Sequence, residues 1–419
     1  MSKKSTASIS NPIGRRELLK AGGVAAGMGI FGRTLSWGEH QQSGQAPPGP
    51  GTWPSDFDPS VANPKYPPRE VPKKGDTIRV FDIEVTIGVH EIVPGIETHM
   101  FLFNGTHPGP EIRVKEGEWV QVNLKNTSPE FHTIHWHGIQ IMCEMDGVPL
   151  GTQWPVGPNQ TFRYLWRAQP AGTHMYHCHV MTTLHMQAGL IGSLIVEPAN
   201  DLVKDHFAYD REYTMILSSI DTEWSRDQLN EMVTMGTQMD VMNNNARLMK
   251  EMNGRMMGWF KNKEAFRDAI KKGYVPPYMN SRMGVNRVIS PNFFMINGKS
   301  YPMTDPLMIH RGETIRVRLI GGSVMPHFIH LHGHDFWHVC QDGSPLASPV
   351  RMNTIPIYPG TTSDIVINGT NAGNWHFHDH SDLATTNNGK HPGGMMTMLM
   401  YEDAKEAGFK FDEVIAVDS

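Results

Sequence analysis

The sequences IRVKEGEWVQVNL, at Ile112–Leu124, and MIHRGETIRVRL, at Met308–Leu319, are two copies of one pattern. Each has a Gly-Glu pair, beginning at Gly117 and at Gly312, followed by apolar and polar residues in alternation. Alternation with a period of two is typical of a β-strand with one buried face. The two glycines are 195 residues apart, and a repeat at this distance indicates two homologous domains.

The rest of each unit also alternates in short runs, such as Thr77–Val85, which are broken by turn pairs such as Asn104-Gly105 and Asn297-Gly298. Short alternating runs with turns between them predict an all-β fold, a sandwich or barrel of about 120 residues per unit. Between the units, residues 221–282 contain many methionines at helix-compatible spacing. We expect a mostly helical insertion or linker there.

Composition excludes several classes of protein. The chain has 419 residues, 39% apolar and 19% charged, with a formal net charge of −5. The body of the chain has no basic block of the kind that binds phosphate backbones, and the sequence has no uninterrupted run of about 20 apolar residues, the length that spans a bilayer. We therefore expect neither a nucleic-acid partner nor a membrane span in the mature protein. Three cysteines without a CxxC pair exclude a disulfide scaffold, whereas 22 histidines and 28 methionines are ligands that suit copper.

The N-terminal segment carries the pattern of an export signal. Gly14-Arg15-Arg16-Glu17-Leu18-Leu19-Lys20 precedes a short, weakly apolar stretch rich in Gly and Ala. This is similar to a bacterial twin-arginine signal, although a basic tail without that role is the alternative. We expect a periplasmic or secreted protein.

Four His-x-His pairs stand out: His135-Trp136-His137, His177-Cys178-His179, His330-Leu331-His332 and His378-Asp379-His380. On a strand, residues i and i+2 share a face, so each pair presents two imidazoles side by side. The pairs at 135 and 330 follow the 195-residue step of the repeat, and those at 177 and 378 follow a step of 201. We expect eight imidazoles to converge on bound metal.

Cys178 projects to the face opposite His177 and His179 because it lies between them on the strand. His132 has the same parity as Cys178, and His185 follows seven residues later. One thiolate and two imidazoles with a weak or absent axial group make a blue-copper site. Two residues compete for the axial place: Leu190, which we favour and which has no donor atom, and Met186.

These motifs together resemble the multicopper oxidases, specifically the two-domain, laccase-like group with the blue type 1 copper in the first domain. The resemblance covers roughly residues 77–401 apart from the Met-rich segment, and rests on His135-Trp-His-Gly, His177-Cys-His, His330-Leu-His-Gly-His and His378-Asp-His. It implies two cupredoxin-like β-sandwich domains and about four coppers per chain, namely one type 1, one type 2 and two type 3.

The resemblance also implies ligand roles. The type 1 copper would take His132, Cys178 and His185, with Leu190 in the axial place. The type 2 copper would take His135 and His330. The two type 3 coppers would take His137, His177 and His380, and His179, His332 and His378. Asp146 matches the acid that helps deliver protons to the cluster, and an ordinary turn aspartate before Gly147 is the alternative.

Two features depart from the family pattern. The interval from Cys178 to His185 is seven residues, longer than the five common in three-domain laccases. In the second domain Asp379 takes the place of the cysteine, so we expect no type 1 copper there, with His327 and His391-x-x-x-x-Met396 as relics of one.

The repeat and the resemblance together predict the domain organisation. We expect an export signal at 1–40, a Pro/Gly-rich linker at 41–76, cupredoxin domains at 77–199 and 286–404, a linker with the Met-rich insertion at 200–285, and a tail at 405–419. A cluster that needs both domains implies, as in relatives, a homotrimer with clusters at the subunit interfaces.

The predicted activity is oxidation of phenolic or aromatic substrates, or of metal ions, coupled to reduction of O2 to water. Eight methionines within residues 232–257 form an amphipathic stripe that either packs on the body or binds Cu(I) in a copper-tolerance cuprous oxidase. Copper nitrite reductase is a further alternative, but it needs only three histidines at its type 2 site. A copper-storage or electron-transfer protein is the non-enzymatic alternative. The sequence leaves open whether Cys143 and Cys340 pair.

Overall fold

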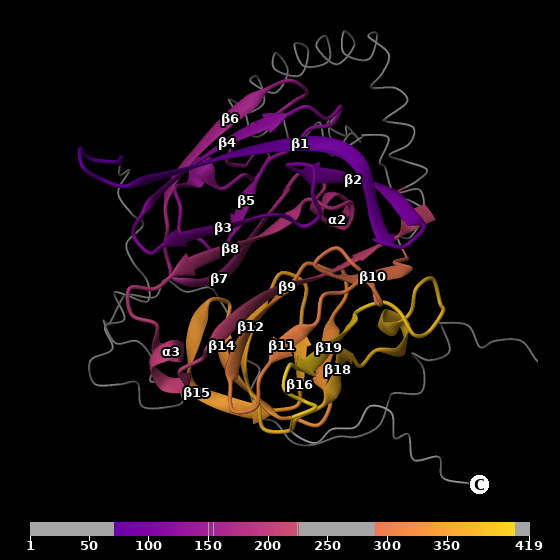
Figure 1. Cartoon of the computed structure of the whole chain (residues 1–419). Helices are drawn as coiled ribbons and strands as arrows, with labels where there is room; N and C mark the ends of the chain where they lie inside the picture. Colours follow the sequence, from indigo (N-terminus) through magenta and orange to yellow (C-terminus); the bar gives the residue numbers. More distant parts are fainter. Residues whose placement is uncertain (1–70, 150, 154, 224, 226–289, 407–419) are drawn as a thin grey trace, which may run out of the picture. The chain divides into compact units, whose positions relative to one another are not determined.

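The computed structural model describes residues 71–149, 151–153, 155–223, 225 and 290–406. In these residues the chain forms two successive β-sandwiches, which confirms the predicted all-β fold (Figure 1). The predicted export signal, most of the N-terminal linker and the Met-rich segment lie outside the described residues. No helix within the described ranges is long and apolar enough to cross a membrane.

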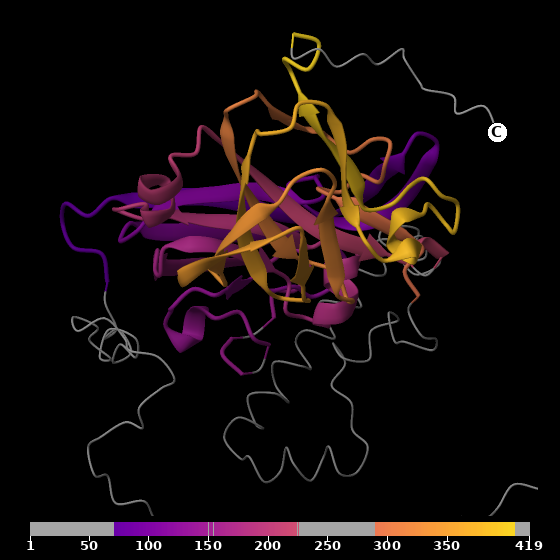
Figure 2. The same cartoon turned by 90° about the horizontal axis from the view of Figure 1, so that it is seen from below.

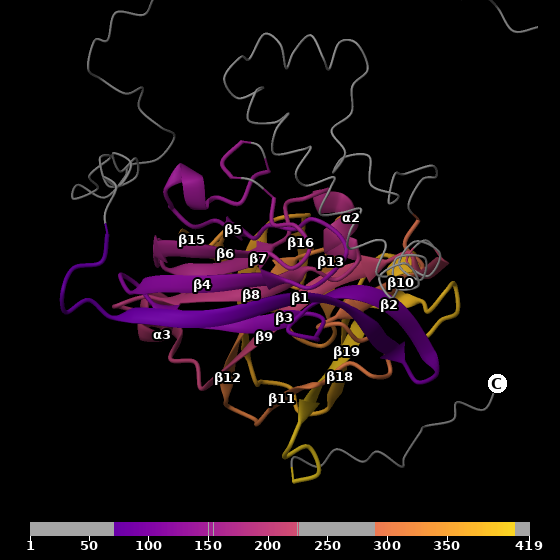
Figure 3. The same cartoon turned by 90° about the horizontal axis from the view of Figure 1, so that it is seen from above.

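The first domain is built from eight strands and two short helices. The strands are β1 (Ile78–Val93), β2 (Ile96–Phe103), β3 (Gly109–Lys115), β4 (Trp119–Asn126), β5 (His135–His137), β6 (Thr161–Arg167), β7 (Gly172–His177) and β8 (Ile191–Glu197). The helices are η1 (Cys143–Met145) and α2 (Thr182–Gln187). One sheet has the order β2-β1-β4-β6 and the other β3-β8-β7-β5. Figure 3 shows β1 and β4 side by side, where they pair in parallel.

The core of the first domain forms because its strands alternate. On β4, Val120, Val122 and Leu124 are fully buried, while Gln121 and Asn123 between them are partly exposed. The buried side chains pack against large aromatics from the facing sheet and from β6, including Trp136 and Trp166. Burial of this apolar surface is the main stabilising force of the sandwich.

The second domain repeats this architecture. Its strands are β9 (Arg211–Ile220), β10 (Phe293–Ile296), β11 (Leu307–Ile309), β12 (Thr314–Gly321), β13 (His327–Leu331), β14 (Phe336–Gln341), β15 (Ser344–Met352), β16 (Thr354–Ile357), β17 (Thr362–Asn368), β18 (Asn374–Asp379) and β19 (Met396–Tyr401). Helices α3 (Leu202–Phe207) and η2 (Asp382–Thr385) accompany them. The sheets have the orders β10-β9-β12-β17-β14-β15 and β11-β19-β18-β13-β16. In Figure 2 strands β10 to β19 of this domain, coloured orange and yellow, face the viewer.

One segment belongs to the second domain although we predicted it in the linker. Strand β9 pairs in parallel with β12 from Arg211 to Leu217, and antiparallel with β10 from Leu217 to Ile220. More than 70 residues separate β9 from β10 in the sequence. The local sequence pattern cannot show that two strands so far apart pair with each other. The linker expected at 200–285 therefore contains the first strand of the second sandwich.

The two predicted turn pairs occur at matching places in the two domains. Asn104 and Asn297 have φ of 53° and 50°, and the glycines after them have φ of 75° and 78°. Two successive positive φ values match the twist of a hairpin, and Asn-Gly is the pair that adopts them most readily. These residues explain why β2 and β10 end where they do.

Strand β7 of the first domain packs against the second domain. The hydroxyl of Thr173 donates to Asp364 Oδ1 at 2.7 Å and accepts from Arg318 Nη1 at 2.7 Å. Apolar contacts extend the interface, with Met175 and Ile191 packed against Ile216 and Ile320. All of these side chains are buried. The strand that ends at His177 is therefore held against the second domain at Thr173 and Met175.

Candidate metal centres

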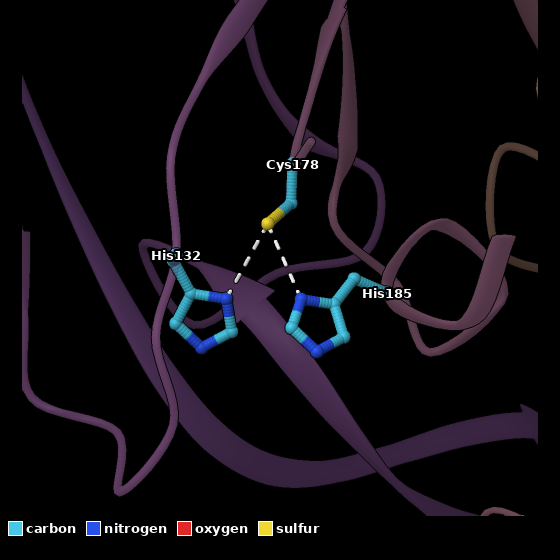
Figure 4. Close-up of side chains that lie close together, drawn as sticks. All are labelled: His132, Cys178 and His185. Carbon is cyan, nitrogen blue, oxygen red and sulfur yellow. Dashed lines mark hydrogen bonds between the residues drawn. The ribbon is translucent and has the colours of Figure 1, made fainter. Parts of the chain in front are cut away.

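Cys178 and two histidines form one buried cluster. Cys178 directly follows β7, His185 lies on α2, and His132 lies in the segment before β5. Cys178 Sγ is 3.5 Å from His132 Nδ1 and 3.3 Å from His185 Nδ1, and none of the three residues is exposed (Figure 4). The structure thus brings His132 and Cys178 together on the side of β7 that the strand parity predicted, and adds His185, the third residue of the predicted set.

A serine fixes the tautomer of His132. Ser128 Oγ lies 2.8 Å from His132 Nε2 and 2.8 Å from Asn126 Oδ1, which can only accept. The hydroxyl therefore donates to Asn126 and accepts from the His132 Nε2–H group. This leaves the lone pair of His132 Nδ1 directed at the sulfur. Ser128 was not among the predicted residues, because a serine near a ligand carries no spacing signal of its own.

Burial keeps this cluster uncharged when no cation is bound. It raises the pKa of the Cys178 thiol to about 12 and lowers the pKa of His185 to about 3. Burial, and then repulsion from His185, holds the pKa of His132 well below its usual range. The Nε2 atom of His185 is buried without a hydrogen-bond partner among the described residues. Converging soft sulfur and imidazole donors fit a copper ion, whose charge would stabilise the thiolate.

The structure separates the two candidates for the axial place. Leu190 is fully buried in the same apolar cluster as Cys178, and its carbonyl accepts from the Cys178 amide at 3.1 Å. Met186 instead packs against the cluster of Met175 and Ile191 at the domain interface. The contacts therefore favour Leu190.

Four histidines of the first domain gather on the other side of β7. Ring centroids of His135 lie 5.5, 5.2 and 5.3 Å from those of His137, His177 and His179. His135 Nδ1 donates to the Asp146 carbonyl at 2.8 Å, and His177 Nδ1 donates to the Cys178 carbonyl at 3.0 Å. In a neutral imidazole each of these bonds places the proton on Nδ1, so that the lone pair of Nε2 can bind a metal.

The second domain holds an equivalent set. Ring centroids of His330 lie 5.0, 5.9 and 5.5 Å from those of His332, His378 and His380. His330 Nδ1 donates to the Asn353 carbonyl at 2.8 Å, and His378 Nδ1 donates to the Asp379 carbonyl at 2.7 Å. Within this set, the Nε2 atoms of His332 and His378 lie 3.0 Å apart. The repeat seen in the sequence thus extends to the hydrogen bonds that orient the imidazoles.

The two quartets do not meet within the described part of one chain. Every ring contact among these eight histidines joins residues of the same domain. A cavity of about 370 Å³ lies over the first quartet. The second domain lines it with Gly322, Ser323, Val324, Pro359 and Gly360 and with no histidine. Each quartet is therefore an incomplete half of the predicted eight-histidine set.

Asp146 lies beside the first quartet. Its Oδ1 is 3.2 Å from His135 Nδ1, and its side chain is 33% exposed. The carboxylate can therefore exchange protons with solvent while it contacts a histidine of the set. This position is compatible with both predicted roles of Asp146, that of the acid that delivers protons and that of an ordinary turn residue.

The second domain has a carboxylate where the first has its sulfur. The fully buried Asp379 accepts from His327 Nδ1, from the Phe328 amide at 3.1 Å and from the Ser381 amide at 2.9 Å. The Asp379 amide donates to the carbonyl of Met395, as the Cys178 amide donates to that of Leu190. By this hydrogen bond Met395 corresponds to Leu190 of the first domain, one residue before the Met396 of the expected relic.

The structure also places the remaining two cysteines and two further histidines, His174 and His391. Cys143 is exposed, Cys340 is buried, and both are free, so they do not pair. His174 is buried and its Nε2 lies 3.0 Å from the Pro170 carbonyl. The exposed His391 contacts the Thr385 carbonyl through Nδ1 at 3.1 Å.

Comparison with known proteins identifies the family. Models described as "Multicopper oxidase" match residues 84–201 and 274–405. The structure of a blue copper oxidase from Nitrosomonas europaea is 33% identical, covering 81% of this chain and 89% of that one, with a TM-score of 0.64. The chain therefore belongs to the multicopper oxidases, a family that binds type 1, type 2 and type 3 copper, typically about four ions per chain.

More distant relatives match this chain over only part of their own length. Copper resistance protein A of Escherichia coli is 28% identical over 297 residues, which is 68% of this chain and 45% of that protein. L-ascorbate oxidase of Nicotiana tabacum is 39% identical over 136 residues, which is 31% of this chain and 22% of that protein. The chain thus spans about half the length of the copper resistance protein.

The Ser128 hydrogen bond generates a prediction. Ser128→Ala leaves the buried His132 Nε2–H group without a partner, and should lower copper affinity at Cys178 by about 10- to 100-fold. Metal competition, followed through the visible thiolate absorption, measures this change. The matched control is Ser323→Ala, 195 residues further on, because Ser323 bonds Ser219 instead of a histidine. Equal losses in the two variants would contradict the assigned role.

Proposed function

We propose that this chain is an oxidase that couples one-electron oxidations of phenolic or aromatic substrates, or of metal ions, to the reduction of O2 to water. One observation carries the proposal. Cys178 contributes sulfur to one cluster while its two neighbours, His177 and His179, contribute imidazoles to another. Three consecutive residues thus join a site that accepts single electrons to a site that can bind O2.

The ligand roles follow the predicted assignment. We assign His132, Cys178 and His185 to type 1 copper, with Leu190 in the axial place. We assign His135 and His330 to type 2 copper, and His137, His177 and His380, and His179, His332 and His378, to the two type 3 coppers. Copper supplies the one-electron redox chemistry, and one O2 consumes four electrons and four protons to give two water molecules.

The chain itself supplies orientation, exclusion of water and protons. Backbone carbonyls hold Nδ1 of His135 and His177 and so direct their Nε2 atoms. The buried cluster at Cys178 is closed to water, which favours the lower charge state of a bound ion. We propose that Asp146 holds a proton beside His135 for delivery to the site of O2 reduction.

Replacing the sulfur tests the activity. Cys178→Ser should lower the copper content from about four to about three per chain, abolish the thiolate absorption and reduce O2 uptake about a hundredfold or more. Cys340→Ser is the control, because Cys340 is also a buried free thiol but lies in another cluster. Undiminished O2 uptake by Cys178→Ser would exclude the proposal.

Copper content also separates the alternatives. About two coppers per chain with nitrite turnover would indicate a nitrite reductase, and a larger variable number without O2 uptake would indicate storage. A nitrite reductase from Thermus scotoductus is 18% identical with a TM-score of 0.54, which shows a common fold alone. Eight paired histidines favour the oxidase.

The role of Asp146 predicts a selective defect. Asp146→Asn removes the exchangeable proton but preserves the shape, and should slow O2 reduction about a hundredfold. Anaerobic bleaching of the thiolate absorption by a reducing substrate should keep its wild-type rate, because that step needs no proton at His135. Asp146→Glu should recover part of the O2 turnover. Equal slowing of both steps would indicate a structural role instead.

We further propose a homotrimer in which the first quartet of one chain completes its set with the second quartet of a neighbour. The absence of contact between the quartets within the described ranges supports this arrangement, since neither half alone supplies the ligand set. Exposed apolar side chains on β1, including Val80 and Val89, and on β13, including Phe328, offer surfaces for a neighbour.

Complementation of inactive variants tests the shared cluster. We expect His135→Ala/His137→Ala and His330→Ala/His332→Ala to be inactive alone. Co-expressed in equal amounts, they should recover about a quarter of wild-type activity, because about one interface in four joins two intact halves. The control is co-expression of two differently tagged chains that both carry the His135→Ala/His137→Ala pair. A fully active monomer in sedimentation, or no recovery on co-expression, would contradict the trimer.

The relatives named for copper resistance favour a second candidate function, that of a cuprous oxidase for copper tolerance. In that case the Met-rich segment at 232–257 would bind Cu(I), and its deletion would reduce Cu(I) turnover more than phenol turnover.

We also retain the predicted domain boundaries, except that β9 belongs to the second domain. We further propose that the Arg15-Arg16 signal directs export of the protein to the periplasm or the exterior.

A further inference from the structure

Strand β19 carries a methionine at every second position beside a strand of histidines. Met396, Met398 and Met400 alternate along β19, which pairs with β18 (Figure 1). In the register of this pair, Met396 lies opposite His378 and Met398 lies opposite His376. Residues opposite each other in a sheet share a face, so the thioethers and the imidazoles lie on the same side.

Two of these side chains are in direct contact. His376 Nδ1 lies 3.3 Å from Met396 Sδ. His376 is exposed, Met398 is partly exposed and Met396 is buried. Nitrogen and thioether donors at this distance can bind one small soft cation, and Cu(I) is the biological metal that prefers this pair. The ring of His376 is 5.5 Å from that of His332, a histidine of the second quartet.

The first domain provides a comparison at the same positions. Met175 on β7 corresponds to His376 through the 201-residue step, and Ile191, opposite His177, corresponds to Met396. Met175 and Ile191 are fully buried in the apolar interface between the domains. Two apolar side chains are therefore enough to pack the sheet at this position, and packing does not require a histidine there. The second domain instead has an exposed histidine on a thioether, which indicates a ligand-binding role.

We propose that His376, Met396 and Met398 bind Cu(I) and supply it to His332 and His378. Nε2 of His332 and Nε2 of His378 lie 3.0 Å apart, and the Nε2 of His378 is unprotonated because its Nδ1 donates to Asp379. Transfer exchanges thioether bonds to the ion for imidazole bonds without a change of oxidation state. The proton that His332 Nε2 donates to His378 Nε2 moves to Nδ1 of the His332 ring as the ion binds. The inference concerns copper loading and holds whether or not the protein reduces O2.

Silver titration of the copper-loaded protein tests the binding step. Ag(I) has the soft-ligand preference of Cu(I) but is redox-silent, so it reports binding alone. Beyond the resident copper, and beyond any Ag(I) that the Met-rich segment at 232–257 takes in every variant, we expect the wild type to bind one Ag(I) per chain that Met396→Leu and His376→Ala bind about tenfold or more weakly. Met400→Leu is the matched control on the same strand and face, and should bind as the wild type does. No additional Ag(I) in the wild type would overturn the proposal.

Reconstitution kinetics test the transfer step. The copper-free protein, mixed anaerobically with Cu(I), should refill its copper sites about tenfold more slowly in Met396→Leu/Met398→Leu than in the wild type or in Met400→Leu. The final copper content should be the same in all three. Thermal unfolding midpoints of the copper-free proteins show whether each variant is folded. An unchanged filling rate in the double variant, or equal slowing in Met400→Leu, would overturn the loading role.

Discussion

The alternation of side chains at the end of β7 is the constraint on which the rest of the site depends. His177, Cys178 and His179 are consecutive, so the sulfur and the imidazoles must leave the strand on opposite sides. A histidine cluster and a thiol cluster can then form within a few bonds of each other only if both sides of this strand are enclosed. The first sandwich encloses the sulfur, and the quartet with its cavity occupies the other side.

The enclosure is rigid because the supporting contacts come from different parts of the chain. Thr173, at the start of β7, is held by Asp364 and Arg318 of the second domain, and these three side chains are buried and hydrogen-bonded to one another. Removing one member of such a network leaves a buried polar group unsatisfied, so the network tolerates little displacement. At the other end of the strand, backbone carbonyls set the imidazole tautomers. The ligand set is therefore oriented before any metal binds.

The two domains diverged by changing a few buried side chains within the same hydrogen-bond pattern. The amides of Cys178 and Asp379 bond equivalent carbonyls, and His132 and His327 occupy equivalent places. Asp379 uses its carboxylate oxygens on His327 and on two backbone amides, so it replaces a soft ligand with a structural acceptor. The surface of the second domain changed in the opposite direction, since His376 and Met396 bring donor atoms to a position that is apolar in the first domain.

The sequence by itself determined the all-β class, the duplication, the four histidine pairs and the side of the strand on which Cys178 meets His132, because these follow from the repeat and from a period of two. It did not determine that β9 belongs to the second sandwich, because pairing partners distant in sequence are selected by tertiary packing. It likewise gave no indication of the hydrogen bond from His132 to Ser128, of the correspondence between Met395 and Leu190, or of the contact between His376 and Met396. Only the tertiary structure decided these, since each depends on the distance between atoms on different strands or loops. The separation of the quartets is of the same kind, because the sequence counts the histidines but only the fold of the chain shows which of them meet.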